Sequence, residues 1–144
     1  MDGQQIETRV ASYPAARPVF RGVYSSDMLP RFPDPPYCFI ANTEDHTKAG
    51  AHWVSFYVFA NHVEFFDSYG RSPDNCMFPE TFSSYISNRL CFHNSRILEG
   101  FLASTCGEFS IYYVTLRSAG VSYREIIDSL SINYAINDYI VKNV

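Results

Sequence analysis

The chain has 144 residues, a formal net charge of −4 and a hydrophobic content of 47%. This length suits one domain with a buried core, and the charged fraction of 18% excludes an intrinsically disordered chain. The acidic balance excludes a globally basic surface that coats nucleic acid. No apolar run approaches the roughly 18 residues of a membrane span, and the first residues do not resemble a signal peptide. We therefore expect an intracellular protein that is neither secreted nor attached to a membrane.

The N-terminal half is predicted to begin with a loose arm and to continue into strands. Residues 1–18 show neither helical nor strand periodicity, and we expect them to form the arm. Residues 37–42 have the composition of a short buried strand. Residues 51–59 are dense in aromatic and β-branched types and form the clearest predicted strand. After a short turn, residues 63–67 return as its hairpin partner.

The C-terminal half is predicted to be mostly helical. A helix starts at Pro79, and residues 91–98 are short and extended. A second helix covers residues 106–116, and Ser122 forms a capping box with Glu125 ahead of a third. A last helix runs from about residue 133 to 142. The first of these helices has apolar residues at helical spacing: Phe82, Tyr85, Ile86 and Leu90. The expected fold class is α+β, a small mixed or antiparallel sheet with flanking helices, in a single domain over residues 19–144.

The pair Cys106-Gly107 opens the predicted helix at 106–116. A helix N-terminus stabilises a thiolate, and its free backbone N–H groups can hold an oxyanion. Taken alone, a buried cysteine is more often an inert part of the core. A nucleophilic cysteine also needs a base and a carboxylate that orients the base.

The two ends of the predicted hairpin supply these groups. His52 opens the first strand and Asp67 closes the second, so both fall at the same edge of the sheet. Alone, each is accounted for as a strand histidine or a turn former. The other histidines lie in loop or turn contexts without a matching partner: His46, His62 and His93. We therefore predict a cysteine protease in which His52 is the base and Asp67 fixes its tautomer.

In the predicted site, Cys106 is the nucleophile, and backbone N–H groups at Cys106 and Gly107 face the oxyanion. The four cysteines show no CxxC spacing, so we expect no zinc site, and the sequence requires no cofactor. In the absence of a secretory signal, the cysteines are expected to be thiols in a reducing compartment.

Several segments together resemble the adenain family, the adenovirus endopeptidases. The resemblance spans roughly residues 20–117 and rests on the segments 20–30, 38–43 (CFIANT), 50–54 (GAHWV), 65–70 (FFDSYG) and 99–107 (EGFLASTCG). It implies a papain-like active site in permuted chain order (His, Asp, Cys), similar at a greater distance to SUMO-specific proteases. It also implies an endopeptidase that processes precursor proteins of a virus or of a self-synthesising DNA transposon. The implied location is the virion and the nucleus or cytoplasm of the host cell.

Glu99 and Cys91 lie near positions that have a function in the adenain family, one in the oxyanion hole and one in activation by a peptide. Adenain has a glutamine seven residues before its cysteine, where this chain has Glu99. Adenain is also activated by a short peptide that forms a disulfide upstream of the nucleophile, and Cys91 is near the corresponding place. A buried structural thiol remains the alternative for Cys91. Adenain uses DNA as a cofactor, which the acidic balance of this chain does not favour.

Three functions remain open on the sequence. The first is the processing protease, acting as a monomer on polypeptide substrates such as viral structural precursors. The second is a ubiquitin- or SUMO-like isopeptidase with the same chemistry. The third is an interaction protein on a decayed protease fold, which Glu99 makes conceivable, because a carboxylate would repel an oxyanion.

Overall fold

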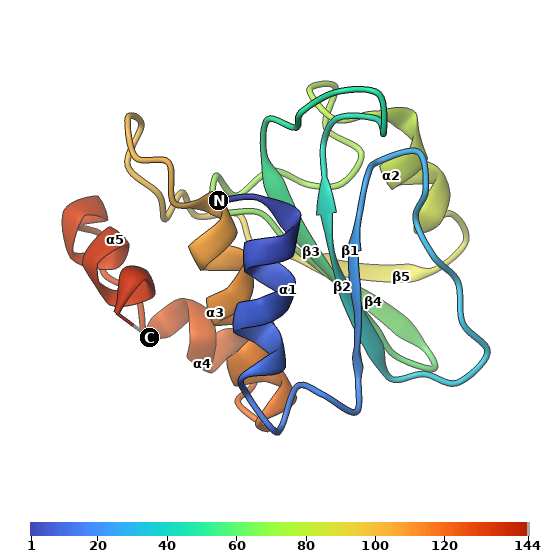
Figure 1. Cartoon of the computed structure of the whole chain (residues 1–144), viewed down its shortest axis with the longest axis horizontal. Helices are drawn as coiled ribbons and strands as arrows, with labels where there is room; N and C mark the ends of the chain where they lie inside the picture. Colours follow the sequence, from blue (N-terminus) through green and yellow to red (C-terminus); the bar gives the residue numbers. More distant parts are fainter. Residues whose placement is uncertain (144) are drawn as a thin grey trace.

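A computed structural model shows an α+β fold, a five-stranded mixed sheet with flanking helices (Figure 1). It describes residues 1–143, so Val144, at the end of the predicted domain, lies outside the described residues. The elements are α1 (Gly3–Ala11), β1 (Phe20–Tyr24), β2 (Tyr37–Asn42), β3 (Trp53–Val58), β4 (His62–Phe66), α2 (Glu80–Tyr85), β5 (Leu90–His93), α3 (Cys106–Ser118), α4 (Tyr123–Asp128) and α5 (Tyr134–Lys142). The predicted fold class is confirmed.

The sheet follows chain order, β1-β2-β3-β4-β5. The two outer pairs are parallel, and the inner pairs β2/β3 and β3/β4 are antiparallel. The predicted hairpin is β3 and β4, in which Ser55 lies opposite Phe66 and Phe56 opposite Phe65. This register brings the start of β3 and the end of β4 to the same edge of the sheet.

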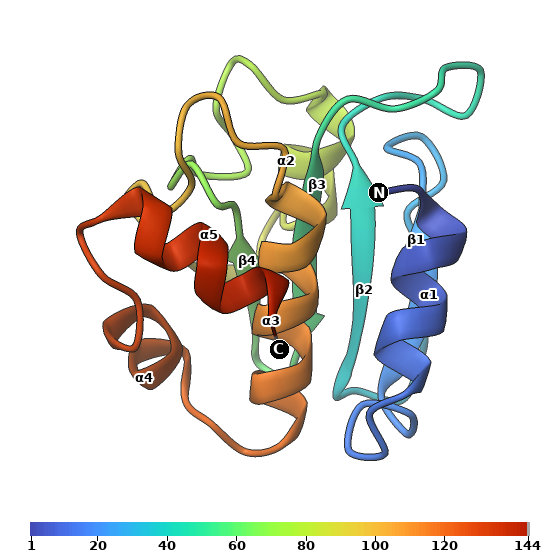
Figure 2. The same ribbon diagram turned by 60° about the vertical axis from the view of Figure 1, so that its left-hand side comes forward.

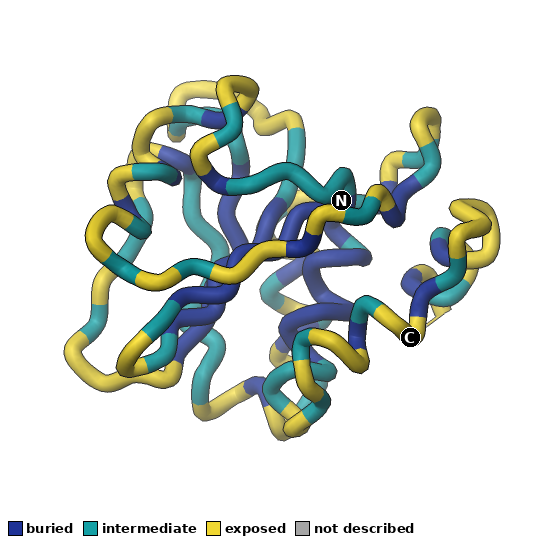
Figure 3. The backbone as a smooth tube through the Cα atoms, turned by 180° about the vertical axis from the view of Figure 1, so that it is seen from behind, coloured by how far each residue is buried: buried dark blue, intermediate teal, exposed yellow. Residues whose placement is uncertain are grey.

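Both faces of the sheet are covered by helices. Side chains alternate along β2, so that Cys38 and Ile40 face the core beneath α1 and α3, whereas Phe39 and Ala41 face Phe82 of α2. Figure 2 shows α3 and α1 on the same side of the sheet, with α2 behind it. Figure 3 shows the central strands and α3 as the buried part of the chain. The two-sided cover explains why β2 is buried throughout and apolar from Tyr37 to Ala41.

Helix α3 is the central helix of the fold. It is buried along most of its length, and its Tyr113 ring stacks on Phe66 of β4 with centroids 4.9 Å apart. Burying a large side chain of this kind contributes about 1.5–3 kcal/mol, so the helix is held firmly against the sheet. Its N-terminal residue, Cys106, is therefore fixed relative to the hairpin edge.

The N-terminal arm was predicted wrongly. Residues 3–11 form α1, with a capping box between Asp2 and Gln5, and Ile6 and Val10 are fully buried against α3 and the sheet. Two apolar side chains are too few for a helical period to be recognised in a short window. The helix is stabilised by the tertiary groove that buries them, because isolated helices of this length are marginal in water.

The helix predicted from Pro79 also ends earlier than expected. It stops at Tyr85, and Leu90 belongs to β5 instead. Asn88 lies between them with a φ of 63°, the left-handed conformation that reverses a chain after a helix. The predicted capping box at Ser122 is present at the start of α4. Within residues 1–143, the helices are all too short or too polar to cross a membrane.

Candidate active site

The hairpin edge brings His52 and Asp67 into contact. His52 immediately precedes β3 and Asp67 immediately follows β4, and the ring Nε2 of His52 lies 2.6 Å from Oδ1 of Asp67. The Asp67 side chain is fully buried and that of His52 is 14% exposed. The hydrogen bond expected from the sequence is therefore present, in a setting largely protected from water.

A second set of contacts fixes the Asp67 carboxylate. Arg71 donates its backbone N–H and its Nε to Oδ2 of Asp67, at 3.1 and 2.8 Å. The Asn94 side chain holds the Asp67 backbone, accepting from its N–H at 3.1 Å and donating to its carbonyl at 2.6 Å. Burial raises the pKa of Asp67, but the bonds from His52 and Arg71 outweigh burial and lower it. Asp67 is thus a carboxylate at neutral pH.

Sequence reasoning missed both Arg71 and Asn94. The turn that returns Arg71 to Asp67 depends on Gly70, whose φ is 70° and whose N–H donates to the Asp67 carbonyl at 2.8 Å. A Cβ at this glycine would lie 2.8 Å from the backbone oxygen of Arg96, so a larger residue would clash. The sequence did contain an indication of the role of Arg71. It is an arginine four residues after a candidate catalytic aspartate, with a glycine between them that allows a turn. Asn94 gave no such indication.

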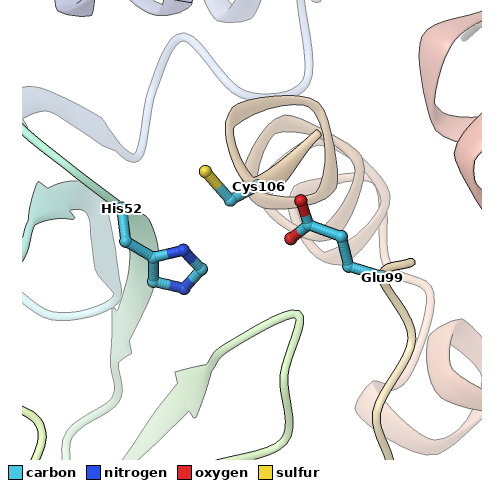
Figure 4. A group of neighbouring side chains, drawn as sticks. All are labelled: His52, Glu99 and Cys106. Atoms are coloured by element: carbon cyan, nitrogen blue, oxygen red, sulfur yellow. The ribbon is translucent and has the colours of Figure 1, made fainter. Parts of the chain in front are cut away.

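Cys106 is the second hydrogen-bonding partner of the His52 side chain. Figure 4 shows its sulfur and the His52 ring approaching each other from α3 and the hairpin edge. Burial alone lowers the pKa of His52, but hydrogen bonds and charge interactions with Asp67 and Cys106 raise it to about 9. The imidazole is therefore protonated at neutral pH, the state required in a thiolate–imidazolium pair.

The first turn of α3 has no side-chain cap. Thr105 occupies the N-cap position, yet its hydroxyl donates to Oδ1 of Asp138 in α5 at 2.8 Å and caps no N–H of α3. The first N–H groups of a helix have no acceptor within the helix. Those of Cys106 and Gly107 are thus free of a capping oxygen, beside the sulfur, where an oxyanion would form.

Glu99 lies at the same site. The backbone N–H groups of Leu98 and Glu99 donate to the Ser68 carbonyl, at 2.8 and 3.2 Å, and attach this loop to the turn after Asp67. The Glu99 carboxyl is 2% exposed, accepting from the Thr105 N–H at 2.9 Å and the Ser68 hydroxyl at 2.5 Å. Burial raises its pKa, and these hydrogen bonds and the His52 charge only partly oppose the effect.

Cys106 is part of the lining of two cavities. One, of about 360 Å³, is lined by residues that include His52, Tyr69, Glu99 and Cys106. The other, of about 300 Å³, includes Trp53, Cys106 and Gly107 in its lining. The Tyr69 ring stacks on His52 with centroids 5.3 Å apart and covers one face of the imidazole. Cys106 is therefore next to open space that both cavities provide.

The other cysteines lie away from these side chains. Cys91 is on the edge strand β5, opposite Val63, and burial raises its pKa to about 11. Cys38 is fully buried in β2, and burial raises its pKa to about 12. Cys76 is exposed in the loop before α2. All four cysteines are free thiols in the structure.

Among known proteins, the chain shows similarity to solved structures. No protein-family model matches the chain, and no curated protein matches its sequence. Among solved structures, the chain is similar to the Se-Met ASFV pS273R protease, with 21% sequence identity and a TM-score of 0.45. The match covers 72% of this chain and 43% of that protein, so the chain spans less than half its length. A similarity at this level does not assign the chain to a family.

Proposed function

We propose that this protein is a cysteine endopeptidase with Cys106 as nucleophile, His52 as general base and acid, and Asp67 as the carboxylate that orients His52. The observation that carries the proposal is the arrangement around His52. Its Nε2 is bound to a buried carboxylate at 2.6 Å, and the Cys106 sulfur lies beside the ring at the uncapped start of a buried helix. This order of groups is the one that acyl transfer by a thiolate requires.

The chemistry follows from the positions of the groups. His52 takes the thiol proton, and the Cys106 thiolate attacks a peptide carbonyl. The resulting oxyanion faces the first N–H groups of α3, and His52 then donates its proton to the leaving amine. Water, deprotonated by His52, hydrolyses the thioester and restores the thiol. Throughout, Asp67 holds the imidazole in one tautomer and stabilises its charged form.

The substrates we propose are polypeptide precursors encoded by a virus or transposon, as the resemblance to the adenain family implies. A fluorogenic ubiquitin-like tail and a short glycine-rich viral peptide distinguish this function from that of an isopeptidase. Cleavage of the peptide alone supports the processing protease. Cys91 is proposed as the partner of an activating peptide, since an edge strand can accept an extended peptide as a further strand.

Alkylation tests the nucleophile directly. At neutral pH, iodoacetamide should label Cys106 before Cys38 and Cys91, because burial holds those two as thiols, with pKa values of about 12 and 11. Cys76 is the matched control, since it is exposed in the loop before α2, away from the His52 imidazolium. Mass spectrometry of briefly treated protein measures the order. If Cys76 is labelled before Cys106, then Cys106 is not an activated thiol, and the proposal is contradicted.

Glu99 gives a second test, because a protonated carboxyl can donate to an oxyanion whereas a carboxylate repels it. Burial raises the pKa of Glu99, which favours the neutral form, and that form is lost as the pH rises. Glu99→Gln supplies a permanent donor of nearly the same shape. We therefore expect it to keep or raise kcat/KM and to remove the part of the alkaline decline in rate that ionisation of Glu99 causes, leaving the part caused by His52.

Glu99→Ala removes the donor and serves as the contrast. Loss of an oxyanion donor costs about a hundredfold or more in kcat, so this variant should be clearly slower than both others. The measurement is kcat/KM against pH for the three proteins with one peptide. Identical rates and profiles would place Glu99 outside the oxyanion hole and leave the backbone N–H groups of α3 as its donors.

A further inference from the structure

Three side chains at this site have the donor atoms of a metal-ligand set. The ring nitrogen of His52, the sulfur of Cys106 and a carboxylate oxygen of Glu99 all lie within 4.8 Å of one another, and Figure 4 shows them converging from three separate segments. Imidazole, thiolate and carboxylate are the ligands that Zn²⁺ prefers. The CxxC argument against zinc considers only ligands that are close in sequence, and it does not apply to this set.

We propose that His52, Glu99 and Cys106 bind a single Zn²⁺ ion, reversibly and in competition with substrate. Zinc bonds of about 2.0–2.3 Å in a tetrahedron separate the ligand atoms by about 3.4–3.6 Å. The distance between each pair of ligand atoms therefore has to shorten by no more than about 1.4 Å, and rotation of the side chains allows this. The fourth position opens into the cavity of about 360 Å³, where water completes the coordination.

The surroundings of these ligands suit a bound cation. The carboxylate of Asp67 already holds the ring nitrogen of His52 that the metal does not use, and it fixes the ring as carboxylates do behind zinc-bound histidines. Ser68 and Thr105 hold the Glu99 carboxylate in a buried position and leave lone pairs on its oxygens. The ligand geometry is thus organised before the ion arrives.

Charge balance gives an independent reason. With zinc bound, Cys106, Glu99 and Asp67 are negative, whereas Zn²⁺ and Arg71 together carry an equal positive charge. On binding, the proton shared by Cys106 and His52 and any proton on Glu99 pass to solvent, and no covalent bond within the protein forms or breaks. The ion then occupies the nucleophile and the base together.

Direct titration of the metal-free chain with Zn²⁺ tests this inference without any substrate. Calorimetry, and competition with a chromophoric chelator, should show one ion per chain. Co²⁺ should give the near-ultraviolet charge-transfer band of a cysteine-ligated metal. Glu99→Gln and Asp67→Asn should each weaken Zn²⁺ binding by about tenfold or more. Cys76→Ser, which removes an exposed thiol outside the site, should leave the affinity unchanged.

Two controls separate zinc bound by these three side chains from zinc bound elsewhere on the chain. Should a variant fail to fold by circular dichroism, alkylation of Cys106 in the wild-type chain gives the same test, because it should abolish binding. Absence of binding, or an affinity unaffected by both Glu99→Gln and Cys106 alkylation, would overturn the metal site. Competition with substrate rests on the proposed function. If the chain binds zinc but cleaves no peptide, the proposal of a metal site is supported and the proposal of a protease is contradicted.

Discussion

Cys106→Ala should reduce peptide cleavage to the background rate. Removal of a nucleophile that acts as a unit with its base lowers kcat by a factor on the order of 10⁶. The buried Cys38 and the half-buried Cys91 cannot replace it, since they are on β2 and β5 and burial raises the pKa of both. The measurement is turnover of a fluorogenic peptide, with circular dichroism to show that the variant is folded.

The matched control for this variant is Cys76→Ala. Cys76 is an exposed thiol in the loop before α2, so its removal should leave kcat within the error of the wild type. Equal loss in both variants would point to a general requirement for thiols rather than to one nucleophile. Proteolysis retained by folded Cys106→Ala would end the protease proposal.

Asp67→Asn should lower kcat by about 10⁴-fold while leaving the fold largely intact. An amide of the same shape no longer fixes the required tautomer of His52 or stabilises its charged form. In the wild type, activity should fall as the pH rises through about 9, because His52 then loses its proton. In Asp67→Asn, this fall in activity should occur at lower pH, since the Asp67 carboxylate is a major cause of the raised pKa of His52.

A measurement of stability against pH tests the same interaction between His52 and Asp67. The folded-state pKa of His52 is raised from 6.5 to about 9, so its contribution to stability is present below about pH 6.5 and is lost as the pH rises through about 9. The wild-type Tm should therefore fall over this interval by more than the Tm of Asp67→Asn. An unchanged pH–rate profile in the variant would exclude Asp67 as the group that orients His52.

The sequence by itself was sufficient for the elements that carry the candidate site. The dense aromatic and β-branched run at 51–59 and its return at 63–67 predicted the hairpin, because strand composition is strong there. Once the hairpin was known, its ends had to place His52 and Asp67 at one edge of the sheet. The apolar run after Cys106 likewise predicted α3, and with it a cysteine at a helix N-terminus.

Only the tertiary structure decided the groups around this site. Arg71 reaches Asp67 because of the positive φ at Gly70, and Asn94 arrives from the far end of β5. The uncapped start of α3 depends on Asp138, which takes the Thr105 hydroxyl. Each of these contacts depends on a backbone conformation or a meeting of segments that no local periodicity encodes.

The same distinction explains α1 and Glu99. A nine-residue helix with two fully buried apolar residues has too weak a local signal, and the groove beside α3 supplies the burial that stabilises it. The sequence showed a carboxyl at position 99, but its meeting with His52 and Cys106 depends on the bonds from Leu98 and Glu99 to Ser68. Local pattern determined which elements form, whereas packing between distant segments decided which side chains meet, because burial and charge act through space and not along the chain.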